Sequence, residues 1–324
     1  MSNNIKNRPN KNQIISRSHS YHGSTFLSAA VSSRDADELY LTPKYPGVHF
    51  LSSVDLTEHL SAGTVEQYCT DKLREFEQKI IAIGPENIGA FIAEPVQASG
   101  GVIISPPGYL RQCKALCSKY DILYISDEVV TGFGRLGHWF ASLPIFDVQP
   151  DIMICAKGLS SGYLPIGALL ISDRLIDEIE SRHISKLKLS QGFTYSGHPV
   201  CCAAALKNIE IIEREGLLAH VNNISAHFQS KLRELLNLPA VIEVHGMGLL
   251  GAVRCEMPNN QNNPAFNLLI VAKCRRAGLF VRSLMNQIVL SPPLIITLHE
   301  INLLFDRLRL GIEMASDEIS KKDA

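Results

Sequence analysis

Long hydrophobic segments are missing from this sequence: the longest apolar runs in its 324 residues are shorter than ten residues. A helix that crosses a bilayer needs about 20 mostly apolar residues, so no membrane-spanning helix is predicted. The first residues, MSNNIKN, are polar and contain no apolar core of the kind found in secretory signal peptides. We therefore expect a cytoplasmic protein that does not bind a membrane.

An excess of charge of one sign is missing as well. The chain has 31 Lys and Arg against 32 Asp and Glu, which gives a formal net charge of -1. Proteins that bind nucleic acids or membrane surfaces carry clusters of basic residues, so neither partner is expected. The eight cysteines do not have the paired spacing of a zinc site. We predict no bound metal, and we predict reduced, buried thiols.

Segments with strand and helix periodicity alternate through the first part of the chain. Continuous apolar runs that are bounded by turn residues are typical of strands buried on both faces of a parallel sheet. This alternation predicts an α/β fold with a mostly parallel sheet. The predicted strands are 13–16, 48–51, 88–96, 122–126, 151–156 and 166–171, and the predicted helices are 64–83 and 108–120.

After residue 199 the pattern changes to helices around short paired strands. We therefore predict a disordered start at residues 1–12, a large domain at 13–205 and a smaller C-terminal α+β domain at 206–324. The helices of this second part are predicted at 199–214, 217–236, 264–277 and 299–316, and its strands within 241–254 and 279–290.

One carboxylate and one amine stand at the ends of two predicted strands: Asp127 follows the run 122–126, and Lys157 follows the run 151–156. Ligands bind at the carboxyl ends of strands in open α/β sheets. A desolvated lysine forms an imine with an aldehyde, and pyridoxal 5'-phosphate needs such a lysine together with an acid at its pyridine nitrogen. Taken singly, Lys157 is explained as a solvated lysine and Asp127 as a helix cap or a partner of Arg135. The pair is what indicates the cofactor.

Five motifs carry a resemblance to a known family. The segment SDEVVTGFGRLG at 126–137 is similar to the signature of class III aminotransferases, which are fold-type I pyridoxal phosphate enzymes, and the likeness is greatest to their ω-aminotransferase branch. The other motifs occur in the family's order, and the match covers nearly the whole chain after residue 12. They are YHG at 21–23, EPVQ at 94–97, AKGL with GYLP at 156–165, and TYSGHP at 194–199.

The resemblance implies a role for each matching residue at the cofactor ring. Lys157 matches the lysine that forms the Schiff base and carries the proton, and Asp127 matches the partner of the pyridine nitrogen. Val129 matches the aliphatic residue on one face of the ring. Tyr21 matches the aromatic residue at the other face, and His22 lies beside it. Outside the family, Tyr21 and His22 would be simple turn residues.

Three further residues receive roles from the same resemblance. Glu94 matches an acid that orders the surroundings of Asp127. Thr194 matches a hydroxyl that reaches the cofactor phosphate across a dimer interface, and its alternative is a loop threonine. Arg282 matches an arginine that binds a substrate carboxylate through its bidentate guanidinium. A surface arginine on a turn is the alternative for Arg282.

The activity that the resemblance implies is transfer of an amino group from a primary amine or ω-amino acid to a 2-oxo acid such as pyruvate. A homodimer with shared active sites is implied as well. Ser99 stands where ornithine and γ-aminobutyrate aminotransferases carry a second glutamate, which favours the ω-branch. Family members also have a longer amino-terminal part with a Gly-Ser turn that holds the phosphate, so we expect a truncated chain. An inactive or non-enzymatic remnant and a related aminomutase or decarboxylase stay open.

Overall fold

Two compact units make up the chain in a computed structural model, and each is described by itself. Unit 1 comprises residues 1–96, 105–133 and 140–214, and unit 2 comprises 97–104, 134–139 and 215–324. The structure describes residues 8–33, 45–55, 63–180, 192–257, 264–284 and 286–321.

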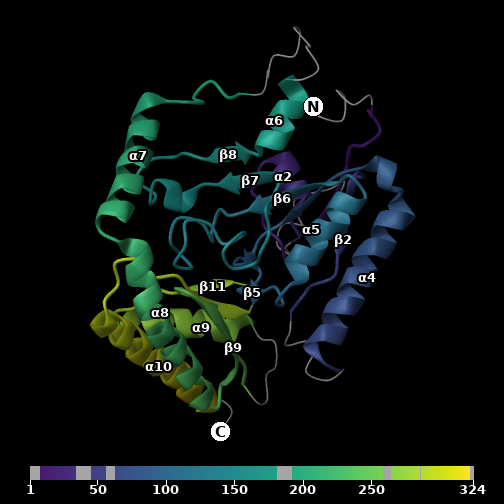
Figure 1. Cartoon of the computed structure of the whole chain (residues 1–324). Coiled ribbons are helices and arrows are strands. Elements are labelled where there is room, and N and C mark those ends of the chain that lie inside the picture. Colours follow the sequence, from purple (N-terminus) through teal and green to yellow (C-terminus); the bar gives the residue numbers. More distant parts are fainter. Residues whose placement is uncertain are drawn as a thin grey trace. The chain divides into compact units, whose positions relative to one another are not determined.

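A six-stranded sheet forms the centre of unit 1, with the strand order β2-β1-β3-β6-β7-β8. Every neighbouring pair is parallel except β7 and β8, which are antiparallel, and Figure 1 shows β6, β7 and β8 side by side. The predicted mostly parallel α/β sheet is therefore confirmed. The strands are β1 (Gln13–Arg17), β2 (Val48–Leu51), β3 (Ile88–Ala93), β6 (Leu123–Asp127), β7 (Ile152–Cys155) and β8 (Ala168–Ile171).

Helices α4 (Val65–Ile83) and α5 (Tyr109–Lys119) flank this sheet. Thr64 caps α4, because its side chain accepts a hydrogen bond from the Gln67 backbone N–H at 3.2 Å. Phe76 of α4 packs on Phe91 of β3 with 4.6 Å between the ring centroids, and both rings are fully buried. The other helices in the described part of unit 1 are α2 (Phe26–Ala30), η2 (Pro85–Asn87), η3 (Lys157–Leu159), α6 (Asp173–Glu180) and α7 (Pro199–Arg214).

Asp151 ties the amino ends of β6 and β7 to two helices. Its carboxylate accepts hydrogen bonds from Lys114 of α5 at 2.8 Å, from Arg174 of α6 at 2.7 Å and from the Tyr124 backbone N–H at 2.8 Å. Burial on its own raises the pKa of Asp151, but these hydrogen bonds outweigh burial and leave the pKa below its usual value. The ionised carboxylate thus stabilises the folded state.

Asp151→Asn is expected to lower the free energy of unfolding at neutral pH by about 2–4 kcal/mol, because two cations and a buried N–H lose their partner. A lowered pKa in the folded state means that this stabilisation is present above the unfolded pKa and is lost as the pH falls. The deficit of Asp151→Asn, measured by urea unfolding, should therefore shrink below about pH 4. Asp147→Asn is the matched control, since Asp147 forms an exposed pair with Arg111 at 3.4 Å; an equal loss in both variants would contradict this role.

Unit 2 contains an antiparallel sheet with the order β11-β12-β10-β9, and Figure 1 shows α8, α9 and α10 together with it. Gly311 of α10 lies so close to α9 that an added Cβ would be 2.4 Å from Cys274 Sγ. Among the helices that the structure describes, none is long and apolar enough to cross a membrane. The elements are α8 (Leu217–Glu234), η4 (Leu235–Asn237), β9 (Val241–Met247), β10 (Leu250–Cys255), α9 (Pro264–Arg276), β11 (Arg282–Leu284), β12 (Gln287–Leu290) and α10 (Leu298–Ser320); β4 (Val96–Gln97) and β5 (Ile103–Ile104) form a separate two-stranded sheet.

Two observations differ from the expected division of the chain. The predicted domain boundary after residue 205 falls inside α7, which continues unit 1 to Arg214, so the functional domain limits stay a prediction. Of the predicted disordered start at residues 1–12, residues 1–7 lie outside the described residues. Residues 8–12 are described and make contacts with the rest of unit 1. There the Lys11 side chain is buried, and its ammonium donates to the backbone carbonyls of Tyr120 and Asp121 at the end of α5.

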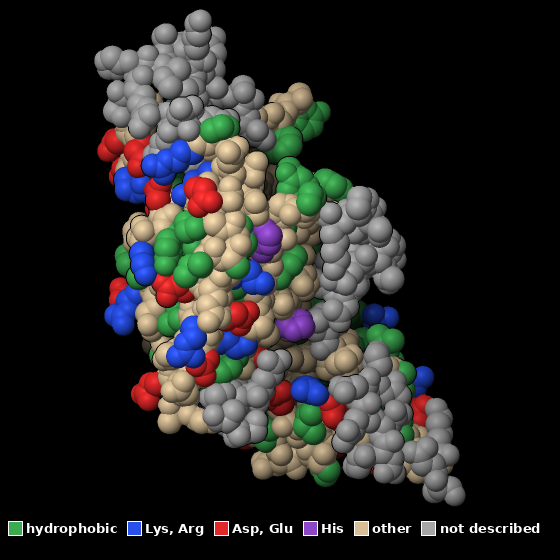
Figure 2. Space-filling model, turned by 90° about the vertical axis from the view of Figure 1, so that its right-hand side faces the viewer, with side chains coloured by type: hydrophobic (Ala, Val, Ile, Leu, Met, Phe, Trp, Pro, Cys, Tyr) green, Lys and Arg blue, Asp and Glu red, His purple; other side chains and the backbone are tan. Residues whose placement is uncertain are grey.

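On the face shown in Figure 2, charged side chains of both signs are interspersed with hydrophobic ones.

Candidate active site

The carboxyl ends of β6 and β7 bring Asp127 and Lys157 to one edge of the sheet. The two strands are parallel neighbours, and Asp127 is in register with Ile154. Lys157 follows Ile154 by three residues and begins the short helix η3. The sheet therefore places both predicted residues at the edge where ligands bind in open α/β folds.

Asp127 is held by two hydrogen bonds. One oxygen, Oδ2, accepts a hydrogen bond from His22 Nδ1 at 2.7 Å, and the other, Oδ1, accepts one from the Val129 backbone N–H at 3.0 Å. The side chains of His22 and Asp127 are only 2% and 5% exposed, so this pair lies in a medium of low dielectric constant. Among the described residues no lysine or arginine forms an ion pair with Asp127. Each carboxylate oxygen accepts one of these hydrogen bonds and keeps a lone pair for a further donor.

Glu94 lies next to this pair at the end of β3. Its carboxylate accepts a hydrogen bond from the Tyr21 backbone N–H at 3.0 Å, and its backbone carbonyl accepts one from the buried guanidinium of Arg17. Burial raises the pKa of Glu94 to about 7, against the attraction of His22. Near neutral pH this buried acid therefore carries about half a proton, within reach of the electrostatic field of Asp127 and His22.

This raised pKa gives a pH-dependent stability that Glu94→Gln removes. Below the usual pKa of 4.5 the folded and unfolded chains both hold the proton, and between 4.5 and about 7 only the folded chain keeps it. Stability therefore falls as the pH rises through this window, by about 3 kcal/mol in total. Urea unfolding of the cofactor-free protein at about pH 5 and about pH 8 should show this loss in the wild type and not in Glu94→Gln. Parallel pH profiles would show that Glu94 ionises normally.

Glu128, the neighbour of Asp127 in the signature segment, is fully buried. Its carboxylate accepts four hydrogen bonds: from the Thr131 hydroxyl, from the backbone N–H groups of Ala141 at 3.0 Å and Ser142 at 2.6 Å, and from the Ser142 hydroxyl at 2.6 Å. These donors satisfy the charge without a cation. Glu128 thus fastens the segment after Asp127 to the chain near Ser142.

Lys157 adopts a left-handed backbone conformation with φ +36°. For a residue with a side chain this conformation costs about 1–3 kcal/mol and persists only where the surroundings fix it. The side chain is exposed, which differs from the desolvated amine that the sequence led us to expect for an imine-forming lysine. Among the described residues, no ion pair involves Lys157. Gly158 follows in close contact with the signature segment, since an added Cβ would lie 2.8 Å from Phe133 Cβ.

The other predicted site residues lie as follows. Val129 and Tyr21 are half-buried, and the Tyr21 hydroxyl lies 2.8 Å from that of Ser24. Thr194 is exposed in the segment before α7. Arg282 is exposed at the start of β11 in unit 2. The structure thus brings Asp127, His22, Glu94, Tyr21 and Val129 together by contacts, and the roles of all eight residues stay predictions.

Sequence reasoning missed three residues that support this edge of the sheet. Arg17 is fully buried and donates to Ser105 at 3.0 Å as well as to Glu94, and an arginine at the end of an apolar strand was the available signal. Glu128 was visible only as part of a motif. Asn208 of α7 contacts the turn after Lys157, and the sequence offers no signal for it.

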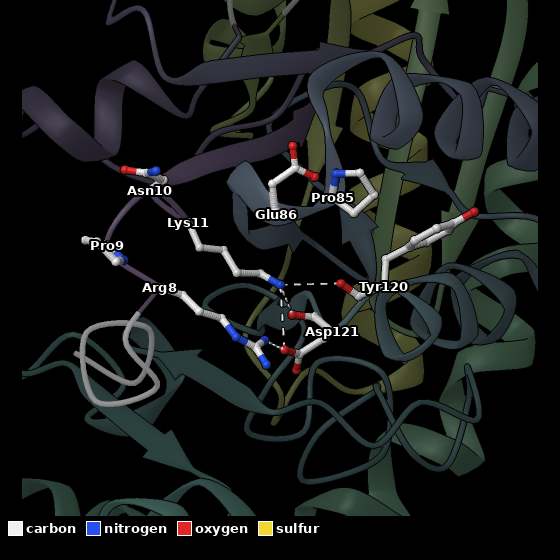
Figure 3. Close-up of a pocket in the computed structure, with 8 residues that line it drawn as sticks. All are labelled: Arg8, Pro9, Asn10, Lys11, Pro85, Glu86, Tyr120 and Asp121. Carbon is white, nitrogen blue, oxygen red and sulfur yellow. Dashed lines mark hydrogen bonds and ion pairs between the residues drawn. The ribbon is translucent and has the colours of Figure 1, made fainter.

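A pocket lies at the edge of the sheet where its strands begin, opposite to the edge with Asp127 and Lys157. It has a volume of about 420 Å³, and its lining comes from chain segments that precede β1, β3 and β6. Figure 3 shows Arg8 and Lys11 directed at Asp121, with which both form ion pairs. The polar groups satisfy one another there, so this pocket is not the candidate site. It is lined by Arg8, Pro9, Asn10, Lys11, Pro85, Glu86, Tyr120 and Asp121.

Solved structures show the same fold. The ω-transaminase of Pseudomonas jessenii in complex with PMP has a TM-score of 0.93 and 34% sequence identity, with 98% of this chain and 72% of that chain covered. A structure described as a transaminase with L-ala has a TM-score of 0.92 and 34% identity over all of this chain and 76% of the other. The fold is that of fold-type I transaminases.

Sequence relatives and a family model identify the family within this fold. γ-Aminobutyrate transaminase 1, mitochondrial, of Oryza sativa subsp. indica is 38% identical over 334 residues, which cover 99% of this chain and 64% of the relative. γ-Aminobutyrate transaminase 3, chloroplastic, of Solanum lycopersicum is 39% identical over 309 residues, which cover 93% and 59%. Residues 1–312 match the model of the class-III aminotransferases, and the chain belongs to this family.

The chain spans less than two thirds of the length of these two relatives. Their names also bear on Ser99. The expectation that Ser99 speaks against a γ-aminobutyrate activity gains no support from relatives that carry this name, so the amino donor stays open.

Class-III aminotransferases use pyridoxal 5'-phosphate, and the residues of this site fit the group. Asp127 is a buried carboxylate that has no lysine or arginine partner in the described part of the chain, and it suits a protonated ring nitrogen. Lys157 is an amine with no ion-pair partner in that same part, and it suits the aldehyde. The half-buried side chain of Val129 follows Asp127 and suits the apolar face of a ring.

Proposed function

We propose that this chain is a pyridoxal phosphate-dependent aminotransferase that moves an amino group from a primary amine or ω-amino acid to a 2-oxo acid such as pyruvate. The observation that carries the proposal is the position of Asp127 and Lys157 at the ends of neighbouring parallel strands. The family membership of the chain supports the reaction type. When bound, the cofactor supplies an electron-accepting ring that stabilises charge at the substrate carbon.

The residues of the chain hold and move protons around that ring. Asp127, oriented by His22 at 2.7 Å, would hold the protonated ring nitrogen through a charge-assisted hydrogen bond. Lys157 would hold the aldehyde and would serve as the general base and acid at the substrate carbon. Val129 and Tyr21 would cover the two faces of the ring and exclude water.

Substrate recognition is proposed to come from Arg282, whose guanidinium forks a carboxylate bidentately. Its exposure at the start of β11 leaves the side chain accessible. Thr194 is proposed to reach a cofactor phosphate in a second subunit of a homodimer. Exposed apolar side chains close in sequence to Thr194 support such an interface: Phe193 is 84% exposed and Tyr195 is 80% exposed.

Incubation of the purified protein with pyridoxal 5'-phosphate, a primary amine or ω-amino acid, and pyruvate tests the proposal. Formation of alanine is the expected result. Release of carbon dioxide or an isomerised substrate without alanine would replace the transaminase by a decarboxylase or an aminomutase. The absence of any product together with the absence of bound cofactor would favour a non-enzymatic protein.

The assembly and location of the protein are further parts of the proposal. We infer a homodimer in the cytoplasm, and several relatives carry mitochondrial or chloroplastic in their names. Sedimentation analysis should give a mass of two chains, and cell fractionation should recover the protein with the cytosol. A monomer with full activity would contradict the shared active site.

A further inference from the structure

Asn208 of α7 holds the turn that follows Lys157 through three hydrogen bonds. Its side-chain amide nitrogen donates to the backbone carbonyls of Gly158 at 2.8 Å and Leu159 at 3.1 Å. Its amide oxygen accepts a hydrogen bond from the Ser161 hydroxyl at 2.7 Å. One half-buried side chain thus connects a helix to three successive parts of one turn.

The backbone of this turn is strained at two positions, although Leu159 and Ser160 donate hydrogen bonds within it. Lys157 and Ser161 both have positive φ angles, +36° and +50°, which side-chain-bearing residues adopt only when the surroundings fix them. On one side, Gly158 is packed against Phe133 and the carbonyl of Gly132, 2.8 and 3.3 Å from where a Cβ would stand. On the other side, Asn208 adds its three hydrogen bonds to those that the turn forms within itself. The turn therefore packs against the signature segment on one side and is hydrogen-bonded to α7 on the other.

The chemistry of asparagine suits this place better than that of a helix-forming residue. An amide has two N–H donors and a carbonyl acceptor in one plane, which matches two carbonyls and a hydroxyl. Asparagine has a lower helix propensity than alanine, so Asn208 does not add to the intrinsic stability of α7. A carboxylate at the same position would place an oxygen against two carbonyl oxygens.

We propose that Asn208 is a positioning residue that fixes the turn 157–161, so that the Lys157 amine leaves the end of β7 in one direction. The inference rests on the proposed function, because it is the cofactor aldehyde that needs the amine in one place. Asn208 acts through the backbone and does not itself touch reacting atoms.

The test compares Asn208→Asp and Asn208→Ala with the control Lys207→Ala, the adjacent exposed residue of α7, which pairs only with Glu210 among the described residues. Each protein is mixed with pyridoxal 5'-phosphate, quenched with borohydride after set times, and digested for mass spectrometry. The rate of labelling at Lys157 is expressed relative to the labelling of other lysines in the same sample. Circular dichroism checks that each variant is folded.

Both Asn208 variants are expected to label Lys157 about tenfold more slowly, the ratio that corresponds to one or two lost hydrogen bonds. Lys207→Ala should match the wild type. If Asn208 has only a structural role, the variants will have a lower melting temperature and an unchanged relative labelling of Lys157. That result would overturn the inference. If Asn208→Asp does not fold, Asn208→Ala carries the comparison, because alanine favours the helix.

A second readout separates this inference from the proposed function. The amides of Leu159 and Ser160 donate within the turn, to Ala156 at 2.8 Å and Lys157 at 3.2 Å. Without cofactor, their hydrogen exchange should be about tenfold faster in Asn208→Ala than in Lys207→Ala. Equal exchange in both variants overturns the positioning role. Faster exchange supports it even if the wild-type Lys157 takes no cofactor, a result that would count against the proposed function alone.

Discussion

Lys157→Ala is expected to lower the rate of alanine formation from pyruvate by about 10⁴-fold, the upper end of the range for loss of a general acid or base. The substitution removes the amine that attaches the cofactor and the base that moves the substrate proton. The backbone of the turn should tolerate it, because Gly158 and Asn208 hold the turn through contacts that do not involve the Lys157 side chain. Alanine formation under saturating amine and pyruvate measures the effect.

Lys119→Ala is the matched control for this prediction. Lys119 is exposed at the end of α5 and pairs with Glu77 at 2.7 Å; it precedes the first residue of β6, whereas Asp127 is the last residue of that strand. It should keep the wild-type rate. Mass spectrometry after borohydride treatment should find cofactor on Lys157 in Lys119→Ala and in the wild type. Turnover in Lys157→Ala within tenfold of the wild-type rate would show that another amine does the chemistry.

The position of Asp127 and Lys157 at one edge of the sheet could be predicted because it depends on local patterns. Each residue ends an apolar run, and parallel neighbouring strands bring such ends to one edge. The antiparallel direction of β8 could not be predicted, since its apolar run has the same composition in either direction. The burial of the Lys11 side chain could not be predicted for a similar reason. Nothing local shows that Lys11 reaches the end of α5, 109 residues away.

The environment of the site could not be predicted from the sequence either, because it depends on contacts between residues that are distant along the chain. The pKa of Glu94 depends on how completely β3 and its neighbours exclude water. The contact between Asn208 and Gly158 joins residues 50 apart along the chain. Such effects belong to the packed fold, whereas a motif reports only which residue types are present.

Glu128→Ala is expected to lower the free energy of unfolding by about 3–5 kcal/mol, because it leaves four donors at Thr131, Ala141 and Ser142 without an acceptor in a fully buried place. Glu128→Gln should lose less, about 1–3 kcal/mol, since one amide oxygen still accepts while the amide nitrogen faces a donor. Urea unfolding at neutral pH measures both losses. Because the segment that Glu128 fastens begins at Asp127, both variants should also bind pyridoxal 5'-phosphate more weakly.

Glu213→Ala controls for the removal of a negative charge, since Glu213 is exposed on α7 and should leave stability nearly unchanged. A loss below about 1 kcal/mol in Glu128→Ala would mean that water replaces the carboxylate at its four donors. The order of the losses in the free energy of unfolding among the three variants distinguishes two explanations. A network held by one buried acceptor loses most with alanine, less with glutamine and almost nothing with a surface change, whereas a general charge effect would make Glu128→Gln and Glu213→Ala equal. The first order would place the Glu128 carboxylate, rather than the charge of the chain, as the group that secures the segment beside Asp127.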